Sequence, residues 1–442
     1  MSSNIPKHWV ETTLGSIATH PQYGWTTKAT NKGKYKYFRT TDIKDPVDWN
    51  NVPFCSELPK NPEDFVIHKN DILVSRAGSV GLSIRIKEDL PDTLFASYLI
   101  RFTPIAPINS KIIEYFFNTK EYWSFISDSQ AGIAVPNVNA SKLSDLPFPL
   151  PPLNEQKRIV AKLDAILPKV KNAKARLENI SKILKKFRQS VLSDACSGKL
   201  TEEWREGKQL PEWEEKKIED IGTLGRGRSK HRPRNDPKLF SGKYPFIQTG
   251  DIAQSKEYIV AHSQTLNEVG LAQSRMWPKN TLCITIAANI ANTAILSYPA
   301  CFPDSVVGFI NDENESELKF VKWVIDNIKN DLENYAPATA QKNINLGILN
   351  KVVFKCPPIE EQHEIVRRVE KLFEVADSIE EKYKAALTHV EKIEQSVLAK
   401  AFRGELVEPD PNDEPAEILL KRILDLKAKS VPPKKRKKKK EK

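Results

Sequence analysis

Two stretches of the chain, residues 159–191 and 365–397, carry apolar residues at alternating steps of four and three, with one tyrosine among them. A period of 3.5 is typical of a coiled-coil seam and predicts two long helices. At 1.5 Å per residue each seam spans about 48 Å. Gly198 and Gly404 follow the last turns and are typical stop signals, whereas Pro168 predicts a bend in the first helix or a shifted start.

The same stretches reveal an internal repeat. Residues 151–200 align without a gap with residues 357–406, and 14 of these 50 positions are identical. PPLNEQKRIV matches PPIEEQHEIV, and QSVL recurs near the end of each copy. Upstream, RTTDI at 39–43 matches QTGDI at 248–252. The chain is therefore a duplication in which a variable segment of about 150 residues precedes each helix.

The variable segments mix strand-like and helix-like patterns. Residues 70–86 and 280–296 predict β-hairpins, and residues 110–126 and 317–335 have apolar faces of helical period. We therefore expect an α+β fold, with two duplicated globular domains joined by two long antiparallel coiled-coil helices in a pseudo-twofold arrangement. Such a rod would act as a ruler with a head at each end.

The expected boundaries follow the repeat. A short amphipathic helix near the C-terminus is expected to dock on the body. The segments are 1–150 (first domain), 151–205 (central helix), 206–356 (second domain), 357–408 (distal helix), 409–431 (amphipathic helix) and 432–442 (basic, disordered tail).

Composition narrows the class of protein. The net charge is +11, but the tail at 432–442 carries seven Lys, one Arg and one Glu, so the body is only mildly basic. A polyanion partner must therefore be held by local clusters of charge. Five cysteines without Cys-x-x-Cys spacing predict reduced thiols and no zinc site. The sequence shows no secretory signal and no apolar run of membrane length, which predicts a cytoplasmic protein.

Common catalytic motifs are absent from the sequence. There is no G-x-x-x-x-G-K-[ST] loop and no [DN]-P-P-[FYW] tetrapeptide. One nuclease-like spacing occurs, in which Asp304 precedes Glu317 and Lys319. The first copy has a Pro-Asp pair at the corresponding place without the Glu-x-Lys, which favours shared turn architecture over catalysis.

Candidate nucleic-acid contacts lie in two basic loops and one hairpin. GRGRSKHRPR at 225–234 is a glycine-containing basic loop, and its counterpart at 20–42 is less basic and more aromatic. Arginine suits guanine, lysine suits phosphate, and Gln or Asn suits adenine. Unlike loops on a shared framework predict a split, asymmetric DNA site. The candidates are Lys28, Lys34, Lys36, Arg39, Thr41 and Arg76 in the first copy, and Arg226, Arg228, Lys230, Arg232, Arg234, Gln248 and Asn343 in the second.

Two further pairs of residues recur at equivalent places. Trp9 and Trp213 begin the two globular segments, and a packing role is favoured over base stacking. A Glu-Gln pair opens each long helix, at 155–156 and at 361–362. These pairs suggest helix caps or contacts with a partner protein, and we favour caps.

The residues that carry the repeat resemble a known family. PLPPLNEQKRIVAKLDAIL and PPIEEQHEIVRRVEKLF, each followed by QSVL and a Gly-x-Leu, are similar to the specificity subunit of type I restriction-modification systems over residues 1–430. The resemblance implies two target recognition domains, each reading half of a split DNA sequence. It also implies that the helices set the spacer and carry two modification subunits that methylate adenine, with restriction subunits joining them.

This resemblance implies no catalytic residue, no metal site and no cofactor in this chain. S-adenosylmethionine, ATP and Mg²⁺ are expected on the partner subunits. An alternative interpretation is a coiled-coil scaffold whose heads bind proteins rather than DNA, and a third is the nuclease.

Overall fold

The computed structural model describes residues 5–130, 136–230, 233, 235–287, 290–329, 332 and 344–430. The chain divides into two compact units. Unit 1 consists of Met1–Arg176 with Ala386–Lys442, and unit 2 of Leu177–Ala385. The division cuts across both long helices, so each helix contributes one half to each unit.

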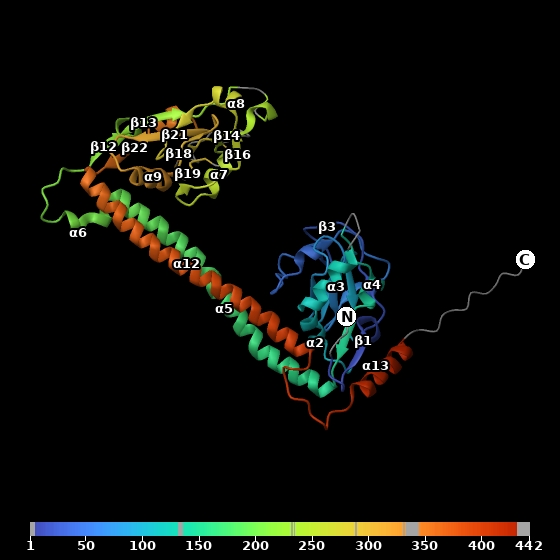
Figure 1. Ribbon diagram of the computed structural model, residues 1–442. Coiled ribbons are helices and arrows are strands. Elements are labelled where there is room, and N and C mark those ends of the chain that lie inside the picture. Colours follow the sequence, from blue (N-terminus) through green and yellow to red (C-terminus); the bar gives the residue numbers. More distant parts are fainter. Residues whose placement is uncertain are drawn as a thin grey trace, which may run out of the picture. The chain divides into compact units, whose positions relative to one another are not determined.

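The two long helices are α5 (Leu153–Ser197) and α12 (Ile359–Phe402), as the 3.5-residue period predicts (Figure 1). Helix α5 continues through Pro168, so the proline does not shift its start. Gly198 and Gly404 follow the helices with φ of 84° and 72°. This left-handed conformation favours glycine and confirms both predicted stops.

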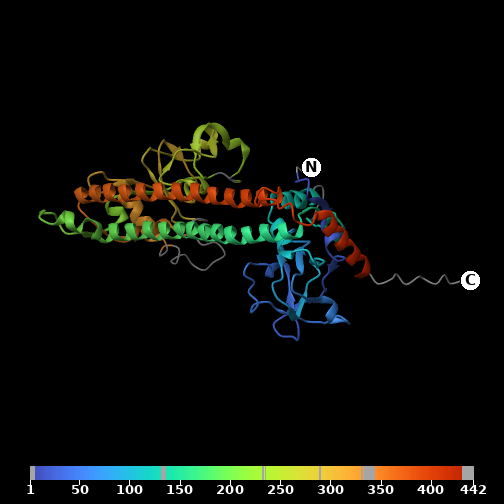
Figure 2. The same ribbon diagram turned by 90° about the horizontal axis from the view of Figure 1, so that it is seen from below.

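Within each unit the two helix halves pair in antiparallel fashion, as predicted (Figure 2). In unit 2 Ala195 of α5 shares a core with Val369 of α12, and Arg188 lies 2.6 Å from Asp377. In unit 1 the Lys174 amine is 3.0 Å from Glu391. As the numbers rise along α5, those of its contacts fall along α12.

The predicted seam is not uniformly buried. Ile365 and Val369 have no exposed surface, but Ile379 and Ile393 remain 42% and 37% exposed. The helix pair therefore covers the seam only in part. A pair of helices encloses side chains only along its line of contact, and the ends of the pair are buried because the globular domains add a further layer.

In the part of unit 1 that the structure describes, the strands form one small and two larger sheets. The small sheet pairs β1 with β11, the second has the order β2-β10-β7-β8, and the third the order β3-β5-β4-β9-β6. The strands are β1 (Val10–Thr13), β2 (Gln22–Tyr23), β3 (Ala29–Thr30), β4 (Lys36–Phe38), β5 (Phe54–Cys55), β6 (Val66–Ile67), β7 (Ile72–Ser75), β8 (Ser83–Arg85), β9 (Leu90–Phe95), β10 (Leu99–Phe102) and β11 (Pro147–Leu150). The other helices are α1 (Leu14–Ile17), α2 (Ser110–Phe116), α3 (Lys120–Gln130), α4 (Ala140–Ser144) and α13 (Ala416–Ser430).

Unit 2 repeats this plan. A small sheet pairs β12 with β22, and the larger sheets have the orders β13-β21-β18-β19-β15 and β16-β14-β20-β17. The strands are β12 (Glu214–Lys217), β13 (Gly222–Arg226), β14 (Phe240–Phe246), β15 (Tyr258–Ile259), β16 (Gln264–Leu266), β17 (Met276–Trp277), β18 (Leu282–Thr285), β19 (Thr293–Leu296), β20 (Ala300–Cys301), β21 (Val306–Asn311) and β22 (Val353–Cys356). The other helices are α6 (Glu202–Arg205), α7 (Thr249–Gln254), α8 (Glu268–Ala272), α9 (Leu318–Asn327) and α11 (Leu346–Asn350).

Both predicted hairpins are present, as β7–β8 and β18–β19. The single helix expected over 110–126 is instead two helices, α2 and α3. Thr119 causes the break, because its hydroxyl donates to the Phe116 carbonyl at 2.7 Å and accepts from the Tyr122 amide at 3.3 Å. An apolar face of helical period continues across such a break, which is why the pattern conceals it.

The C-terminal amphipathic helix docks as predicted. Leu419 and Ile423 of α13 are fully buried and share the core of unit 1 with Leu14 and Ile17 of α1. Burying two such side chains stabilises the unit by about 3–6 kcal/mol. The basic tail at 432–442 lies outside the described residues.

Candidate nucleic-acid interface

The Glu-Gln pair at the start of each long helix connects the helix to its globular domain. All four side chains, those of Glu155, Gln156, Glu361 and Gln362, are completely buried. The Gln156 amide donates to the Pro151 carbonyl at 2.9 Å, and its carbonyl oxygen accepts from the Asn109 amide at 3.1 Å. Asn109 is the N-cap residue of α2.

Gln362 occupies the equivalent position in unit 2. Its amide donates to the Pro357 carbonyl at 2.9 Å, and its carbonyl oxygen accepts from the Glu317 amide at 2.8 Å. Glu317 is the N-cap residue of α9. Each glutamine therefore joins the backbone just before its long helix to the first turn of a domain helix. The expectation that these residues cap their own helices is wrong for the glutamines, whose carbonyl oxygens point across to another element.

The two glutamates bind the tryptophans that open the globular domains. The indole nitrogen of Trp9 donates to Glu155 at 3.0 Å, and that of Trp213 donates to Glu361 at 3.0 Å. Trp9 is only 4% exposed, which confirms the predicted packing role. The glutamates accept from side chains rather than from the free amides of their own first turn, so they are not caps either.

The remaining partners of the two glutamates differ. His8 approaches Glu155 with its Nε2 at 2.9 Å. Glu361 instead accepts from the Thr201 hydroxyl at 2.7 Å and from the Arg205 guanidinium. Both oxygens of the Glu361 carboxylate therefore have the partners that a buried carboxylate requires. The two partners of Glu155 both bond to its Oε2, and its buried Oε1 has no hydrogen-bond partner among the described residues.

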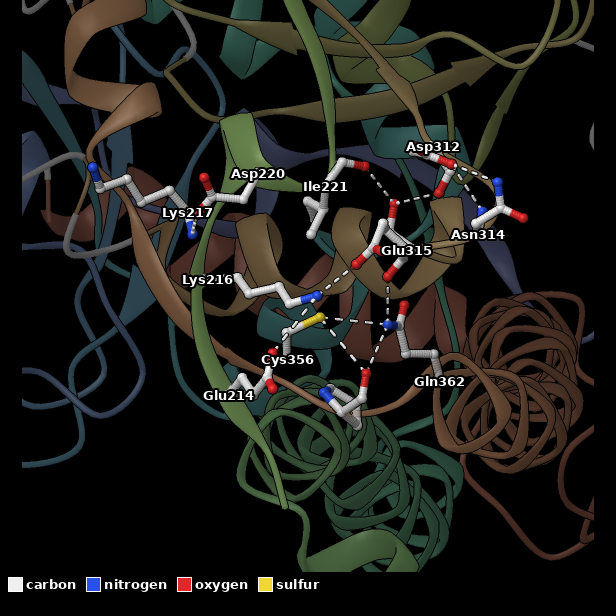
Figure 3. Close-up of polar contacts among 12 residues, drawn as sticks. Glu214, Lys216, Lys217, Asp220, Ile221, Asp312, Asn314, Glu315, Cys356 and Gln362 are labelled. Carbon is white, nitrogen blue, oxygen red and sulfur yellow. Dashed lines mark hydrogen bonds and ion pairs between the residues drawn. The ribbon is translucent and has the colours of Figure 1, made fainter. Parts of the chain in front are cut away.

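Figure 3 shows how the contacts of Gln362, at the joint between the second globular domain and α12, extend to the small sheet of β12 and β22. The Gln362 amide also donates to the Glu315 carbonyl at 3.0 Å and contacts the Cys356 sulfur at 3.4 Å. Lys216 of β12 donates to the Glu315 carboxylate at 2.6 Å, and this bond raises the pKa of the lysine. Burial raises the pKa of the Cys356 thiol to about 11, so it stays protonated. Together these bonds fix the domain on the helix.

The candidate DNA contacts of the first domain fall into two classes. Lys28 and Lys34 are exposed, with the Lys34 amine 5.4 Å from the centre of the Tyr35 ring. The Lys36 amine, by contrast, donates to the Trp49 carbonyl. The exposed amines of Lys28 and Lys34 are accessible to a phosphate, whereas the Lys36 amine is held by a bond within its own domain.

Arg39 and Gln248 occupy equivalent turns. The Arg39 guanidinium donates two bonds of 3.0 Å to Asp42, which raise its pKa. The Gln248 backbone amide likewise bonds to Asp251 at 2.8 Å. Because two of its nitrogens donate to Asp42, the Arg39 guanidinium is held in this turn. Thr41 beside it is exposed.

In the second domain the basic loop leaves the end of β13. Arg226, Arg228 and Lys230 are exposed, and the Arg226 Nε donates to the Asp304 carbonyl. The predicted contacts Arg232, Arg234 and Asn343 lie outside the described residues.

Arg76 follows β7 in the first domain. Its guanidinium lies 4.7 Å from the centre of the Tyr23 ring, and its Nε is 3.4 Å from the Asn137 Oδ1. Tyr98, which sequence reasoning did not identify, lies beside it and is 61% exposed. The sequence gives no sign of this exposure, because buried strand residues surround Tyr98 on both sides.

The nuclease interpretation does not fit the geometry. Asp304 precedes β21 and Glu317 follows it. The strand therefore separates the two carboxylates by about 20 Å, too far to share a metal ion. The Lys319 amine pairs with Glu257 at 2.7 Å and with Glu370. No group of three His, Cys, Asp or Glu side chains suited to a metal occurs among the residues that the structure describes.

No helix in the described part of the chain combines the length and the apolar character needed to cross a membrane.

The chain is similar to known proteins over most of its length. The family described as "Type I restriction modification DNA specificity domain" matches residues 6–182 and 211–389, one match for each copy of the repeat. The chain is 30% identical over 374 residues to the Type I restriction enzyme StySPI specificity subunit of Salmonella potsdam, covering 79% of this chain and 78% of that protein. It is 31% identical over 366 residues to the EcoKI specificity subunit of Escherichia coli (strain K12), covering 79% and 78%.

Solved structures share the fold. One chain, from work on complex assembly and conformational transition of the type I R-M system, superposes with a TM-score of 0.73 over 91% of this chain and 99% of its own, at 17% identity. The HsdS subunit from Thermoanaerobacter tengcongensis gives a TM-score of 0.51 over 91% and 98%, also at 17% identity.

Proposed function

Because the chain belongs to the family of type I restriction-modification DNA specificity domains, we propose that it recognises a split, asymmetric DNA sequence, with each globular domain reading one half. The observation that carries the proposal is the duplicated domain. Both copies have the strand order of one sheet in common and the same joint to a long helix, but they differ in the side chains on their loops. A common framework with unlike loops suits two unlike half-sites.

The proposed DNA contacts are the exposed basic residues of these loops and the residues at the adjacent turns. Lysine and arginine at such places neutralise phosphates and read base edges. The proposed set is Lys28, Lys34, Lys36, Arg39, Thr41 and Arg76 in the first domain, and Arg226, Arg228, Lys230, Arg232, Arg234, Gln248 and Asn343 in the second. Within this set, Lys36 and Arg39 contribute least to binding because their own domain already occupies their charged groups.

The long helices are the proposed docking surface for two methyltransferase subunits, with restriction subunits joining the complex. Apolar side chains left uncovered on the helix pair support this role, since Ile183 is 57% exposed and Val375 is 53% exposed. This chain would then contribute recognition without catalysis. S-adenosylmethionine, ATP and Mg²⁺ would be bound by the partner subunits, and the complex would act on DNA in the cytoplasm.

Mapping of methylated adenines in the host genome tests the proposal. With the gene present, methylation is expected at one motif that has two defined halves around a spacer of fixed length. Deleting the gene is expected to abolish methylation of that motif alone, and complementation with the intact gene is expected to restore it. An unchanged methylation pattern after deletion would refute the proposal and favour a scaffold that binds only proteins.

A further inference from the structure

The two domains can be compared residue by residue at one end of their matching sheets. In the first domain Tyr23 of β2 pairs with Ile100 of β10. In the second domain Arg226 of β13 pairs with Val307 of β21. Ile100 and Val307 hold the same place in their ladders, because each is paired on its other side with the next-to-last residue of the central strand, Val74 of β7 and Ile284 of β18. Tyr23 and Arg226 are therefore equivalent.

The hairpins supply two more equivalent pairs. The amide of Arg76 donates to the carbonyl of Tyr98 at 2.9 Å, and the amide of Ile286 donates to the carbonyl of Ser305 at 3.0 Å. Arg76 and Ile286 each follow the last residue of the central strand. Arg76 thus corresponds to Ile286, and Tyr98 to Ser305.

We call the positions of Tyr23, Arg76 and Tyr98, with their equivalents Arg226, Ile286 and Ser305, the sheet-end positions. They come together because β10 pairs with β2 on one side and with β7 on the other, so that Tyr23, the residue before β10 and the residue after β7 lie at the same end of the antiparallel sheet.

In the first domain the sheet-end positions hold one oriented arginine and two tyrosines. The guanidinium of Arg76 lies over the Tyr23 ring, and the Tyr23 hydroxyl is fixed by the amide of Ala140 at 3.0 Å. Stacking on a ring restricts a guanidinium without using up its paired N–H donors. Tyr98 adds an exposed ring and hydroxyl beside it.

In the second domain the arginine belongs to β13, the equivalent of β2, and not to the equivalent of β7. Arg226 takes the place of Tyr23, while the place of Arg76 is taken by Ile286, which is 2% exposed. The Nε of Arg226 donates to the Asp304 carbonyl, which holds the guanidinium through one of its donors. Each domain therefore presents an oriented arginine at this end of its sheet, but from different strands, so the two forks approach a ligand from different directions.

We propose that the sheet-end arginines are specificity-determining residues, so that Arg76 reads a guanine in one half of the DNA site and Arg226 reads a guanine in the other. This inference rests on the proposed function. The two N–H groups of an arginine fork match the O6 and N7 acceptors of guanine in the major groove, and such a pair discriminates against a wrong base by about 1–3 kcal/mol. Orientation by Tyr23 or by the Asp304 carbonyl lowers the entropy cost of forming that pair.

Binding selection with the assembled complex tests this inference. The chain, together with its modification subunits, selects from duplexes in which either half-site is randomised. Arg76→Ala is expected to reduce the preference for guanine at one position of one half-site by about 5-fold to 150-fold, with the other half-site unaffected. Arg226→Ala is expected to do the same in the opposite half.

Conservative variants separate base reading from charge. Arg76→Lys and Arg226→Lys keep the charge but lose the fork, so they are expected to retain the salt dependence of binding while losing the guanine preference. As a matched control, Lys60→Ala removes an exposed charge of the first domain and is expected to leave every base preference unchanged.

The outcomes distinguish failure of the proposed function from failure of the inference about the arginines. If the wild-type complex shows no sequence preference, the proposed function itself fails. If the wild type selects a split site while all four arginine variants keep its guanine preferences, only the inference fails. Relaxation of both half-sites by a single variant would likewise overturn it, because each arginine lies in one domain.

Discussion

Gln362 offers a direct test of the joint between the second globular domain and α12. Replacing it by methionine keeps the volume of the side chain but removes all of its polar atoms. The Glu317 amide and the Pro357 and Glu315 carbonyls then lose partners that lie at 2.8, 2.9 and 3.0 Å in the wild type. The side chain is completely buried, so water does not readily replace these bonds.

The expected cost follows from this count. A buried backbone group without a partner costs about 1–3 kcal/mol, and three of them give about 3–5 kcal/mol if the joint relaxes slightly. Since 1.4 kcal/mol corresponds to a factor of ten, local opening at the joint should become about 100-fold to 4000-fold more frequent. The effect should be confined to β12, β22 and the start of α9.

Hydrogen exchange read by mass spectrometry measures this opening. Peptides that cover α9 and β22 should exchange faster in Gln362→Met, and those of β7 and β10 in unit 1 should not change. Gln254→Met, at an exposed position on α7, is the matched control and should resemble the wild type. Wild-type exchange across α9 and β22 in Gln362→Met would refute the assignment of the joint to this glutamine.

Two further predictions concern acid stability and the C-terminal helix. Hydrogen bonds, first from Arg367 and then from Arg368, lower the pKa of Glu364 from 4.5 to about 2; its stabilisation is therefore present above about pH 4.5 and lost as the pH falls toward 2. Glu364→Gln should lower the melting temperature at pH 7 but much less at pH 2.5, and an equal difference at both pH values would contradict this account. On α13, Ile423→Ala at a fully buried position should destabilise unit 1 by about 2–5 kcal/mol in thermal denaturation. Ile418→Ala, at a position 50% exposed on the same helix, should cost under about 1 kcal/mol, and similar losses for the two variants would show that α13 does not dock through Ile423.

Local patterns determined much of the fold. The 3.5-residue period located α5 and α12, the repeat identified the two domains, and Gly198 and Gly404 marked the helix ends. Periodicity and left-handed glycines act over a few residues, so they can be read without knowledge of distant contacts. The break between α2 and α3 could not be predicted from the period, because a single threonine causes the break and the apolar face continues across it.

In the candidate site, too, contacts between neighbouring residues could be predicted from the sequence and contacts between distant residues could not. The commitment of Arg39 to Asp42, three residues away, was in principle readable from the sequence, because an acidic residue at that spacing caps a turn. The role of the Glu-Gln pairs could not be predicted from the sequence. Gln362 bonds to a residue 45 positions away and Glu155 to one 146 positions away, and nothing local marks either partner.

The sequence by itself therefore determined the helices, the duplication and the supply of basic side chains. Only the tertiary structure decided which of those side chains are committed to their own domain and which are presented at the end of a sheet. The physical reason is register: the pairing of β2 with β10 and of β10 with β7 brings Tyr23 and Arg76 together from positions 53 residues apart. Side-chain direction alternates along a strand, so one step of register would have separated them.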